Sequence, residues 1–437
     1  MAYELATDIS SLEARTIRKL KWRILPFICL LYVVAYLDRI NVGFAALTMN
    51  RDLGISSQQY GFAVGIFFVG YFLFEIPSNL LLHRIGARVW IARILITWGI
   101  VAMLTGLVHN VQQLYIARFL LGLAEAGYYP GVVLYLTYWF RQREQAQAIA
   151  IVLIGVPVTS ILGGPISGFI LDHVHWLALG SWRWLLILEG VPAVLCGILA
   201  YMILPTRPEE AKFLAPEERN WILGELAREH EKKISEHQVS LAETFTHWRV
   251  WHLASIQFTA LVGLYSLSFW MPQVVKALST HYSNTAVGWL VVIPQLVGLT
   301  SMVLVSRSSD RTLERRLHAG IAVLVSGIGW IGLSAAVTPM MSMLMLSLVA
   351  AGVYSFFGPF WSMPSEFLHG YAAASGIAMI NSIGNLGGFA GPYTIGFIKD
   401  RTGSMYWGLV FVGISMMLSA ILLVLLPKKA RARERKT

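Results

Sequence analysis

The pentapeptide Gly168-Phe-Ile-Leu-Asp172 occurs again 228 residues later, with one change, as Gly396-Phe-Ile-Lys-Asp400. Two further pairs of short motifs keep nearly the same spacing, 227 residues, and the same order along the chain. Chance matches between apolar stretches would not share one offset and one order, so the sequence predicts an internal repeat of two related halves. The further pairs are Gly164-Pro165 with Gly391-Pro392, and His83-Arg84 with Asp310-Arg311.

The composition excludes most soluble proteins. Of the 437 residues 56% are apolar and only 13% are charged, against about 25% charged in an ordinary soluble domain, and the mean hydropathy is +0.61. The two cysteines, Cys29 and Cys196, cannot build a disulfide framework, a zinc site or an iron–sulfur site. The sequence contains no phosphate-binding glycine loop, metalloprotease helix or nucleophile elbow. We therefore expect neither an enzyme nor an ATP-driven pump, and no cofactor or metal.

Twelve segments are long and apolar enough to cross a bilayer. A spanning helix needs about 20 mostly apolar residues, because its backbone must satisfy its own hydrogen bonds in hydrocarbon. The sequence thus predicts an all-α membrane protein with six helices in each half. The segments lie near 24–48, 58–82, 89–109, 112–139, 147–171, 184–204, 251–276, 285–306, 318–337, 341–364, 372–398 and 405–426.

Basic residues predict the orientation of these segments. The formal charge is +10, but the lysines and arginines flank apolar segments, so they indicate topology rather than nucleic-acid binding. With a cytoplasmic N-terminus, nineteen basic residues fall in the short inside segments and the tail, and four fall outside: Arg51, Lys276, Lys399 and Arg401. We therefore expect both termini in the cytoplasm.

The composition changes sharply between the sixth and seventh segments. Residues 205–249 are rich in charges of both signs, for example Glu217, Glu218 and Arg219, which is typical of a solvated amphipathic helix. This stretch is too short for the output domain of a membrane sensor. We expect an N-terminal bundle at 1–204, a cytoplasmic linker at 205–249, and a C-terminal bundle with a basic tail at 250–437.

Ionisable residues inside the apolar segments are confined to the first half. Each costs at least about 2.5–3.5 kcal/mol at mid-bilayer, so each is expected to face the bundle interior and to have a partner. The last six segments contain essentially none before their ends. The ion chemistry is therefore predicted to lie in the N-terminal half. The residues are Asp38, Arg39, Glu75, Arg118, Glu125 and Glu189.

Their spacing limits how they can cooperate. Arg118 and Glu125 are two helical turns apart, so they should share one face, about 10.5 Å apart along the axis, and serve two levels of one cavity. Asp38 and Arg39 are adjacent, so their side chains diverge by about 100°. Either one of them faces the cavity while the other faces a neighbouring helix, or the two bracket a groove.

The chemistry of these groups favours transport of an anion with protons. An arginine grips a carboxylate through two parallel hydrogen bonds and keeps its charge, so Arg39 is the predicted substrate clamp. A buried carboxylate near an arginine can change protonation as its surroundings open and close, a role that suits Asp38 and Glu125. Arg118 is the predicted partner of Asp38, and a structural ion pair between them is the alternative. Glu75 fits a structural contact better than a proton site.

The loop Asn79-Leu-Leu-Leu-His-Arg84-Ile-Gly86-Ala-Arg88 resembles the G-x-x-x-D-R-x-G-R-R loop of the major facilitator superfamily, with histidine in place of the acid. The second half has Asp310-Arg311 at the matching place. The resemblance covers residues 20–427 and implies two pseudo-symmetric six-helix bundles that alternate around a central site. It also implies a cytoplasmic gate formed by Arg84, Gly86, Arg88, Asp310 and Arg311.

Four further motifs resemble the anion:cation symporter family, whose members carry hydroxy acids, sugar acids and aromatic acids with protons. The resemblance assigns Asp38, Arg39, Arg118 and Glu125 to proton and anion handling. It implies substrate contacts from Tyr36, Tyr71, Gln257 and Asn385. The motifs are Tyr36-Leu-Asp38-Arg39-Ile-Asn41, Phe74-Glu75-Ile-Pro77-Ser78-Asn79, Arg118-Phe-Leu-Leu-Gly122-Leu-Ala-Glu125-Ala-Gly127 and Asn385-Leu-Gly387-Gly388-Phe-Ala-Gly391-Pro392.

Together these observations predict a monomeric proton-coupled importer of a small organic acid in the inner membrane of a bacterium. An exchanger or a sodium-coupled carrier would use the same cavity and is the alternative within transport. A membrane sensor without transport activity is a more remote alternative. The predicted partners are the organic acid and the lipid bilayer.

Overall fold

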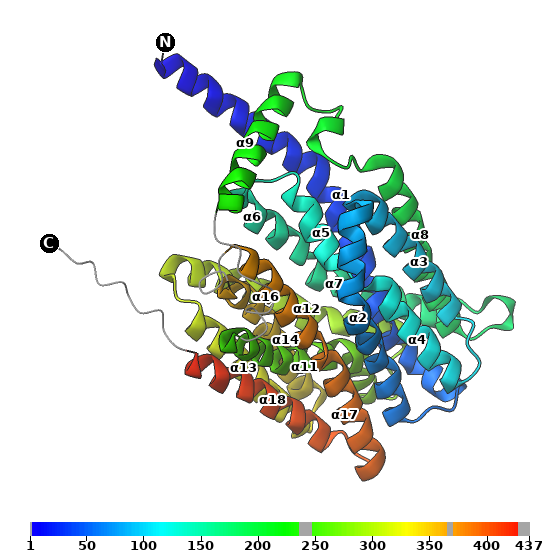
Figure 1. The fold of residues 1–437 in the computed structure, drawn as a ribbon. Helices are drawn as coiled ribbons and strands as arrows, with labels where there is room; N and C mark the ends of the chain where they lie inside the picture. Colours follow the sequence, from blue (N-terminus) through cyan, green and yellow to red (C-terminus); the bar gives the residue numbers. More distant parts are fainter. Residues whose placement is uncertain (1, 236–246, 365–369, 427–437) are drawn as a thin grey trace.

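The computed structural model describes residues 2–235, 247–364 and 370–426, which form helices and no strand. The chain folds into two groups of helices that lie side by side (Figure 1). The first group contains α1 (Ala2–Asp52), α2 (Ser57–Ile85), α3 (Ala87–Thr105), α4 (Val111–Glu125), α5 (Tyr128–Thr137), α6 (Gln142–Leu153), α7 (Gly155–His173) and α8 (Ser181–Ile203). The second contains α11 (Trp248–Ala277), α12 (Asn284–Thr312), α13 (Arg316–Ser334), α14 (Pro339–Ser362), α16 (Gly370–Asn385), α17 (Gly387–Thr402) and α18 (Tyr406–Leu425).

Three of the twelve predicted segments are interrupted helices. The segment 112–139 forms α4 and α5, 147–171 forms α6 and α7, and 372–398 forms α16 and α17. Eleven stretches among the described residues are long and apolar enough to cross a membrane. The twelfth segment is the α16–α17 pair, whose two helices have 16 residues each.

The break between α4 and α5 has a local cause. Gly127 adopts φ +85°, a conformation that favours glycine, and a Cβ there would collide with the Ser78 hydroxyl. The break frees the carbonyl of Ala126, which accepts a hydrogen bond from Ser78 Oγ at 2.6 Å. Trp90 Nε1 in turn donates to Ser78 Oγ at 2.9 Å. The interruption therefore has bonded partners, and it ends α4 directly after Glu125.

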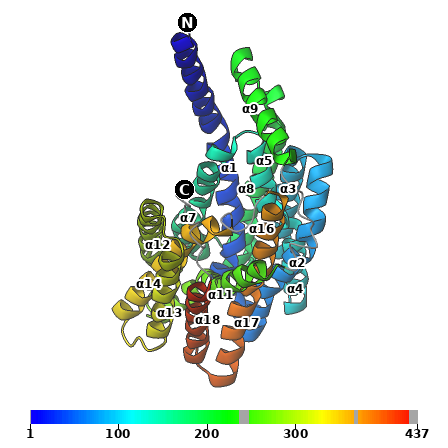
Figure 2. The same cartoon turned by 60° about the vertical axis from the view of Figure 1, so that its left-hand side comes forward.

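The two faces of the bundle differ. The first turns of α1 and the helix α9 (Pro216–Ser235) extend beyond the other helices on one side, the linker face (Figure 2). The opposite face carries the turn at 53–56 between α1 and α2. Towards the opposite face the two groups pack closely through α7 against α12 and α2 against α17.

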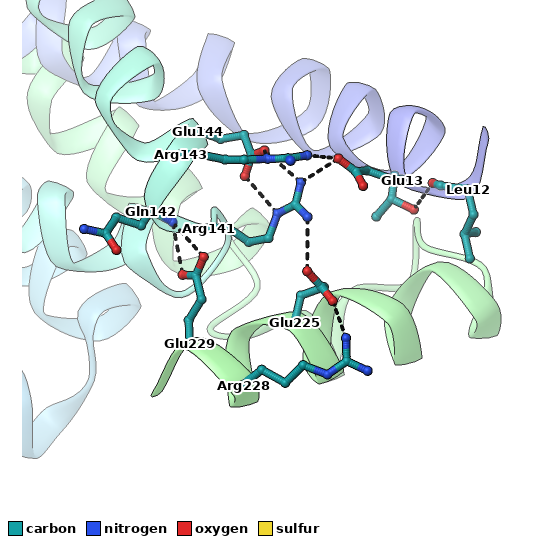
Figure 3. Close-up of polar contacts among 10 residues, drawn as sticks. Leu12, Glu13, Arg141, Gln142, Arg143, Glu144, Glu225, Arg228 and Glu229 are labelled. Carbon is teal, nitrogen blue, oxygen red and sulfur yellow. Dashed lines mark hydrogen bonds and ion pairs between the residues drawn. The ribbon is translucent and has the colours of Figure 1, made fainter. Parts of the chain in front are cut away.

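The helix α9 is held against the first group by a cluster of charges. Arg141 is 4% exposed, and its guanidinium donates to Glu13 at 3.0 Å, Glu144 at 2.8 Å and Glu225 at 3.2 Å (Figure 3). These carboxylates come from α1, α6 and α9, so one buried cation joins three elements. The helix α9 lies within the expected linker 205–249, of which 236–246 fall outside the described residues.

Candidate functional site

A cavity of about 100 Å³ lies between the two groups of helices. Its wall is made by both groups, from α1, α2, α4, α5, α6 and α7 on one side and from α11, α12, α14 and α16 on the other. The lining residues are Tyr32, Ala35, Tyr36, Arg39, Tyr71, Glu125, Tyr128, Tyr129, Leu153, Val156, Pro157, Gln257, Leu261, Leu264, Tyr265, Met302, Tyr354, Phe357, Trp361, Asn381 and Asn385.

Among the described residues, Arg39 is the one charged donor in this wall. Its side chain is 14% exposed, and it forms an ion pair with the carboxylate of Glu125. Nη1 donates to the Tyr265 hydroxyl at 3.3 Å. The rings of Tyr36 and Tyr71 lie 5.7 Å and 5.6 Å from the guanidinium carbon, within the range of cation–π attraction. The guanidinium is thus fixed at the cavity surface by both groups of helices.

Tyr265 extends this arrangement across the cavity. Its hydroxyl donates to Asn385 Oδ1 at 2.9 Å, so Arg39 of α1, Tyr265 of α11 and Asn385 of α16 form one chain of hydrogen bonds. Such a chain makes the position of the guanidinium depend on how the two groups of helices are placed.

Several buried polar atoms of the wall have no partner among the described residues. They are the hydroxyls of Tyr36 and Tyr128, Arg39 Nε, Glu125 Oε2 and Gln257 Oε1. Buried polar groups without a hydrogen bond are costly, so native structures usually supply a partner, either water or a bound molecule. The cavity can therefore take a small molecule that carries a negative charge and several hydrogen-bonding groups.

Asp38 and Arg118 do not line the cavity. Asp38 is 1% exposed and lies inside the first group of helices, where Asn41 Nδ2 donates to its Oδ1 at 3.4 Å. Arg118 influences it electrostatically, but among the described residues no ion pair within 4.0 Å joins them. Of Arg118 and Glu125, which the spacing predicts to serve two levels of one cavity, only Glu125 lies in the wall of this cavity.

Phe67 of α2 lies within contact distance of the guanidinium of Arg118 and of that of Arg39. Its ring centroid lies 5.1 Å from the guanidinium carbon of Arg118 and 5.7 Å from that of Arg39. The ring thus lies against both cations. Arg118 remains in the interior of the first group, and Arg39 occupies the cavity side. Of the two arrangements expected for Asp38 and Arg39, the structure has the one in which Arg39 faces the cavity.

The predicted gate residues make contacts within their own halves. Arg88 Nη1 donates to the Leu204 carbonyl at 3.4 Å and lies 3.8 Å from Glu210. Asp310 forms an ion pair with Arg315. Gly86, at φ +95°, separates α2 from α3. The side chains of Arg84 and Arg311 are exposed. Among the described residues these groups form no bond between the two halves.

The structure brings together Arg39, Glu125, Tyr36, Tyr71, Gln257 and Asn385 from the predicted set. Sequence reasoning missed Tyr265, which lies eight residues after Gln257 and therefore on a similar face of α11. It also missed the surroundings of Glu75 and Glu189. Glu75 contacts the second half, and Glu189 accepts from Ser167 Oγ at 2.7 Å inside the first half.

Two helical halves around a polar cavity define a membrane transporter. The family model of the Major Facilitator Superfamily matches residues 28–392, and the chain belongs to this superfamily. It is 46% identical over 424 residues, 96% of this chain and 93% of the relative, to an Agrobacterium vitis protein whose name assigns it provisionally to tartrate transport. It is 37% identical to the inner membrane transport protein RhmT of Escherichia coli (strain K12), over 86% of this chain and 87% of that one.

Solved structures show the same fold. The chain superposes on the xylose transporter XylE from E. coli in an inward open conformation with a TM-score of 0.75 and 15% identity, covering 94% of this chain and 97% of that one. It also superposes on a bacterial homolog of the human lysosomal transporter Spinster, inward-facing and unoccupied, with a TM-score of 0.70 and 18% identity, over 93% and 95% of the two chains.

Proposed function

We propose that the protein is a secondary active transporter that imports a small organic anion together with protons by alternating access. The observation that carries this proposal is the Arg39–Glu125 ion pair in the cavity wall. The name of the Agrobacterium vitis relative supports hydroxy dicarboxylates such as tartrate as the first substrates to test.

The ion pair provides a physical link between anion and proton. A substrate carboxylate that binds Arg39 must replace the carboxylate of Glu125 as the partner of the guanidinium. Glu125 is then a buried carboxylate without a cation, which favours the neutral, protonated form. Anion binding and proton binding therefore assist each other, and each is weaker alone.

Asp38 is a second proton-handling group in this proposal, although it acts from the interior of the first half. One proton with a monoanion crosses without net charge. With a monoanion, a second proton would carry one positive charge inward and gain about 2.3 kcal/mol per 100 mV of membrane potential. With a dianion such as tartrate, the second proton would make the cycle electroneutral. Neutralising Asp38 alone and Glu125 alone therefore distinguishes one-proton from two-proton coupling.

The face at which the halves pack closely supports an assignment of the stage of the transport cycle. With the linker face in the cytoplasm, as the basic residues predict, the halves are joined on the outer side of the cavity. This arrangement corresponds to an inward-facing stage of the cycle. Arg88 and Asp310, bonded within their own halves, are then available to close the cytoplasmic side at another stage.

The test is uptake into proteoliposomes with an imposed pH gradient. The panel contains tartrate, other hydroxy acids, sugar acids and aromatic acids. We expect at least one of them to accumulate when the outside is acidic, and accumulation to cease with a protonophore. Absence of pH-driven flux for every acid would contradict proton symport.

The same liposomes separate the alternatives. An exchanger would take up labelled acid only when the lumen holds unlabelled acid, with or without a pH gradient. A sodium-coupled carrier would require a sodium gradient instead.

A further inference from the structure

Glu75 is a buried carboxyl that joins the two halves beside the cavity. It is 0% exposed and lies one turn after Tyr71 on α2. Asn381 Nδ2 of α16 donates to Oε1 at 3.1 Å, and the Ser382 hydroxyl forms a short hydrogen bond with Oε2. Asn381 itself lines the cavity. Glu75 therefore lies one residue away from the site, at a contact between α2 and α16.

The surroundings of Glu75 supply no counter-ion. Among the described residues, no lysine, arginine or histidine nitrogen lies within 4.0 Å of it. The titratable groups that face it are Arg39 of α1, Tyr71 of α2 and Tyr265 of α11, and Arg39 is already paired with Glu125. An unpaired carboxylate in such a place is costly, and such a group usually takes up a proton instead.

We propose that Glu75 is a third proton-carrying group of the transporter, which holds a hydrogen between the two halves while they are in contact. An amide nitrogen only donates, so Oε1 stays an acceptor for Asn381. A hydroxyl can accept, so the hydrogen sits on Oε2 and is donated to Ser382 Oγ. The hydrogen comes from water in the cavity and returns to water when α2 and α16 separate. This proposal rests on the proton coupling proposed above.

The test is infrared spectroscopy of the purified protein in lipid without substrate. The difference between the parent and Glu75→Gln should contain the carbonyl band of a protonated carboxyl at neutral pH. The band should shift in Ser382→Ala, because the hydrogen-bond acceptor is gone. If no such band is lost in Glu75→Gln, the carboxyl is ionised and the proposal is wrong, while the uptake results still stand.

A second readout separates a proton carrier from a structural bridge. Glutamine keeps the hydrogen bonds to α16 but cannot release a proton. If Glu75 carries a proton, Glu75→Gln retains substrate exchange and its pH-driven uptake has a changed pH profile. If Glu75 is only a bridge, the profile of Glu75→Gln matches that of the parent. Should glutamine prevent folding, Glu75→Asp keeps a titratable carboxyl but withdraws it from α16. A shifted pH profile of uptake is then expected if Glu75 carries a proton, and an unshifted profile would contradict the proposal.

A different set of contacts joins the halves on the opposite face. Asp172, at the end of α7, accepts hydrogen bonds from the first two residues of α12. Its Oδ1 accepts from Asn284 N at 3.2 Å and Asn284 Nδ2 at 2.8 Å. Its Oδ2 accepts from Thr285 N and Thr285 Oγ1 at 2.7 Å each. Asp400 of α17 accepts likewise from two residues at the start of α2, Ser57 N at 3.0 Å and Gln58 N at 2.7 Å.

The two contacts are related by the internal repeat. Asp172 and Asp400 end the repeated pentapeptide, and Thr285 lies 228 residues after Ser57. Each carboxylate thus meets the helix N-terminus of the other half, where free N–H groups and the helix dipole favour an anion. A Cβ on Gly168 or Gly396, four residues earlier, would collide with the backbone of that same helix start. The backbones therefore approach closely at both places.

The geometry points to Asp172 and Asp400 as two matched latches that keep the halves together on the opposite face. Each aspartate can be substituted without changing a residue of the cavity wall. A lost helix cap typically changes an equilibrium roughly five-fold. We therefore expect each alanine substitution to raise the open-to-closed ratio on this face by about that factor, and the double variant to combine the two effects.

The test measures a distance across the opposite face by electron paramagnetic resonance. The spin labels are attached to cysteines introduced at His109 and Ser404, which are exposed in loops of the two halves. The native Cys29 and Cys196 are substituted so that they are not labelled. We expect the Asp172→Ala, Asp400→Ala chain to populate a longer distance than the parent. Identical distributions in the two chains would overturn the proposal.

A matched control lies on the same face. Asp52 accepts from Trp182 Nε1 at 2.7 Å, and both residues belong to the first half. Asp52→Ala therefore removes a carboxylate contact of similar kind that does not join the halves. Its distance distribution should equal that of the parent. An equal widening in Asp52→Ala would show a loss of local structure and would also overturn the latch assignment.

Discussion

The two halves share one fold but contribute different chemistry to the cavity. The first half supplies Arg39 and Glu125. In the part of the second half that the structure describes, the wall contains only neutral side chains, among them Gln257, Tyr265 and Asn385. The two repeated halves therefore give the cavity a charged side and a neutral side. Under the proposed function, we expect that charge recognition and hydrogen-bond selectivity can be changed separately.

The same comparison explains how the halves communicate. Arg39 belongs to the first half, but its hydrogen bond to Tyr265 places one of its contacts on the second. Glu75 likewise belongs to the first half and accepts from α16 of the second. Movement of the neutral half thus changes the surroundings of the charged groups directly, as the proposed proton coupling requires.

The largest effect is expected from Arg39→Lys. Lysine keeps the charge but loses the planar fork and the geometry that reaches both Tyr265 and a carboxylate. Loss of charge-assisted hydrogen bonds of this kind costs about 1.5–3 kcal/mol, so the affinity for the transported acid should fall roughly ten- to hundred-fold. Isothermal titration of the purified protein measures this change.

The control for Arg39→Lys is Arg93→Lys. Arg93 is a further ionisable residue inside a spanning helix, α3, and it is not among the six residues singled out from the sequence. Its guanidinium carbon lies 3.8 Å from the centre of the Trp90 ring, and it is not part of the cavity wall. Its substitution should leave the affinity unchanged. Equal losses in the two variants would mean that the charged half does not bind the anion through Arg39.

A smaller effect is expected from Tyr265→Phe, which removes the link between the charged and the neutral half. The hydroxyl bridges Arg39 and Asn385, and one such hydrogen bond is worth about 1 kcal/mol. Transport affinity should fall roughly five-fold with little loss of stability. Concentration-dependent uptake in liposomes measures it.

Tyr60→Phe is the matched change. Tyr60 is another buried tyrosine at the contact between the halves, and its hydroxyl donates to the Phe269 carbonyl at 2.9 Å, outside the cavity wall. We expect its half-maximal uptake concentration to equal that of the parent. If Tyr60→Phe and Tyr265→Phe weaken uptake equally, Tyr265 has no special place in the site.

The smallest effect is expected away from the cavity, where α9 of the linker contacts α1. Glu218 is buried, and Arg15 and Lys19 approach its carboxylate to 2.9 Å. Burial by itself raises the pKa of Glu218, but hydrogen bonds from Lys19 and the Ala215 N–H, with the charge of Arg15, bring the pKa below its usual value. A lowered pKa in the folded state means that this stabilisation is present above the usual pKa and is lost as the pH falls through the folded-state pKa.

Arg15 and Lys19 are 56% and 43% exposed, so solvent screens the pair and its contribution is at most about 1 kcal/mol. We expect Glu218→Gln to speed hydrogen exchange in α9 slightly at neutral pH, with transport unchanged. Glu217→Gln, an exposed neighbour, should not alter exchange. If acidification to pH 3 does not lower the protection of α9 in the parent, measured relative to the intrinsic exchange rate at each pH, the pKa assignment is wrong.

Much of the fold could be predicted from the sequence, because a membrane limits the chain to apolar helices of fixed length and the repeat fixes the number of helices in each half. The interruptions at Gly127, Ile154 and Leu386 could not be predicted, because periodicity does not show where a neighbouring side chain such as Ser78 will bind a freed carbonyl. The sequence therefore indicates the path of each span but not its breaks.

The site could be predicted in part for a similar reason. Buried charges are costly, so Arg39 and Glu125 stand out in an apolar sequence. Which charge faces the cavity depends on the packing of the first half, where Phe67, one apolar residue among many, lies against both Arg39 and Arg118. Tyr265 and the contact of Glu75 with Asn381 depend on the packing of one half on the other, which no motif within one half contains.

The most direct measurement is the number of protons taken up when the anion binds to purified protein in weakly buffered solution. The ligand is the acid that the liposome panel identifies, and the comparison is the parent with Glu125→Gln. If the anion displaces Glu125 from Arg39, the parent takes up about one proton per bound anion near neutral pH, and Glu125→Gln binds the anion with at least one proton fewer. Equal proton uptake by both proteins would contradict the account.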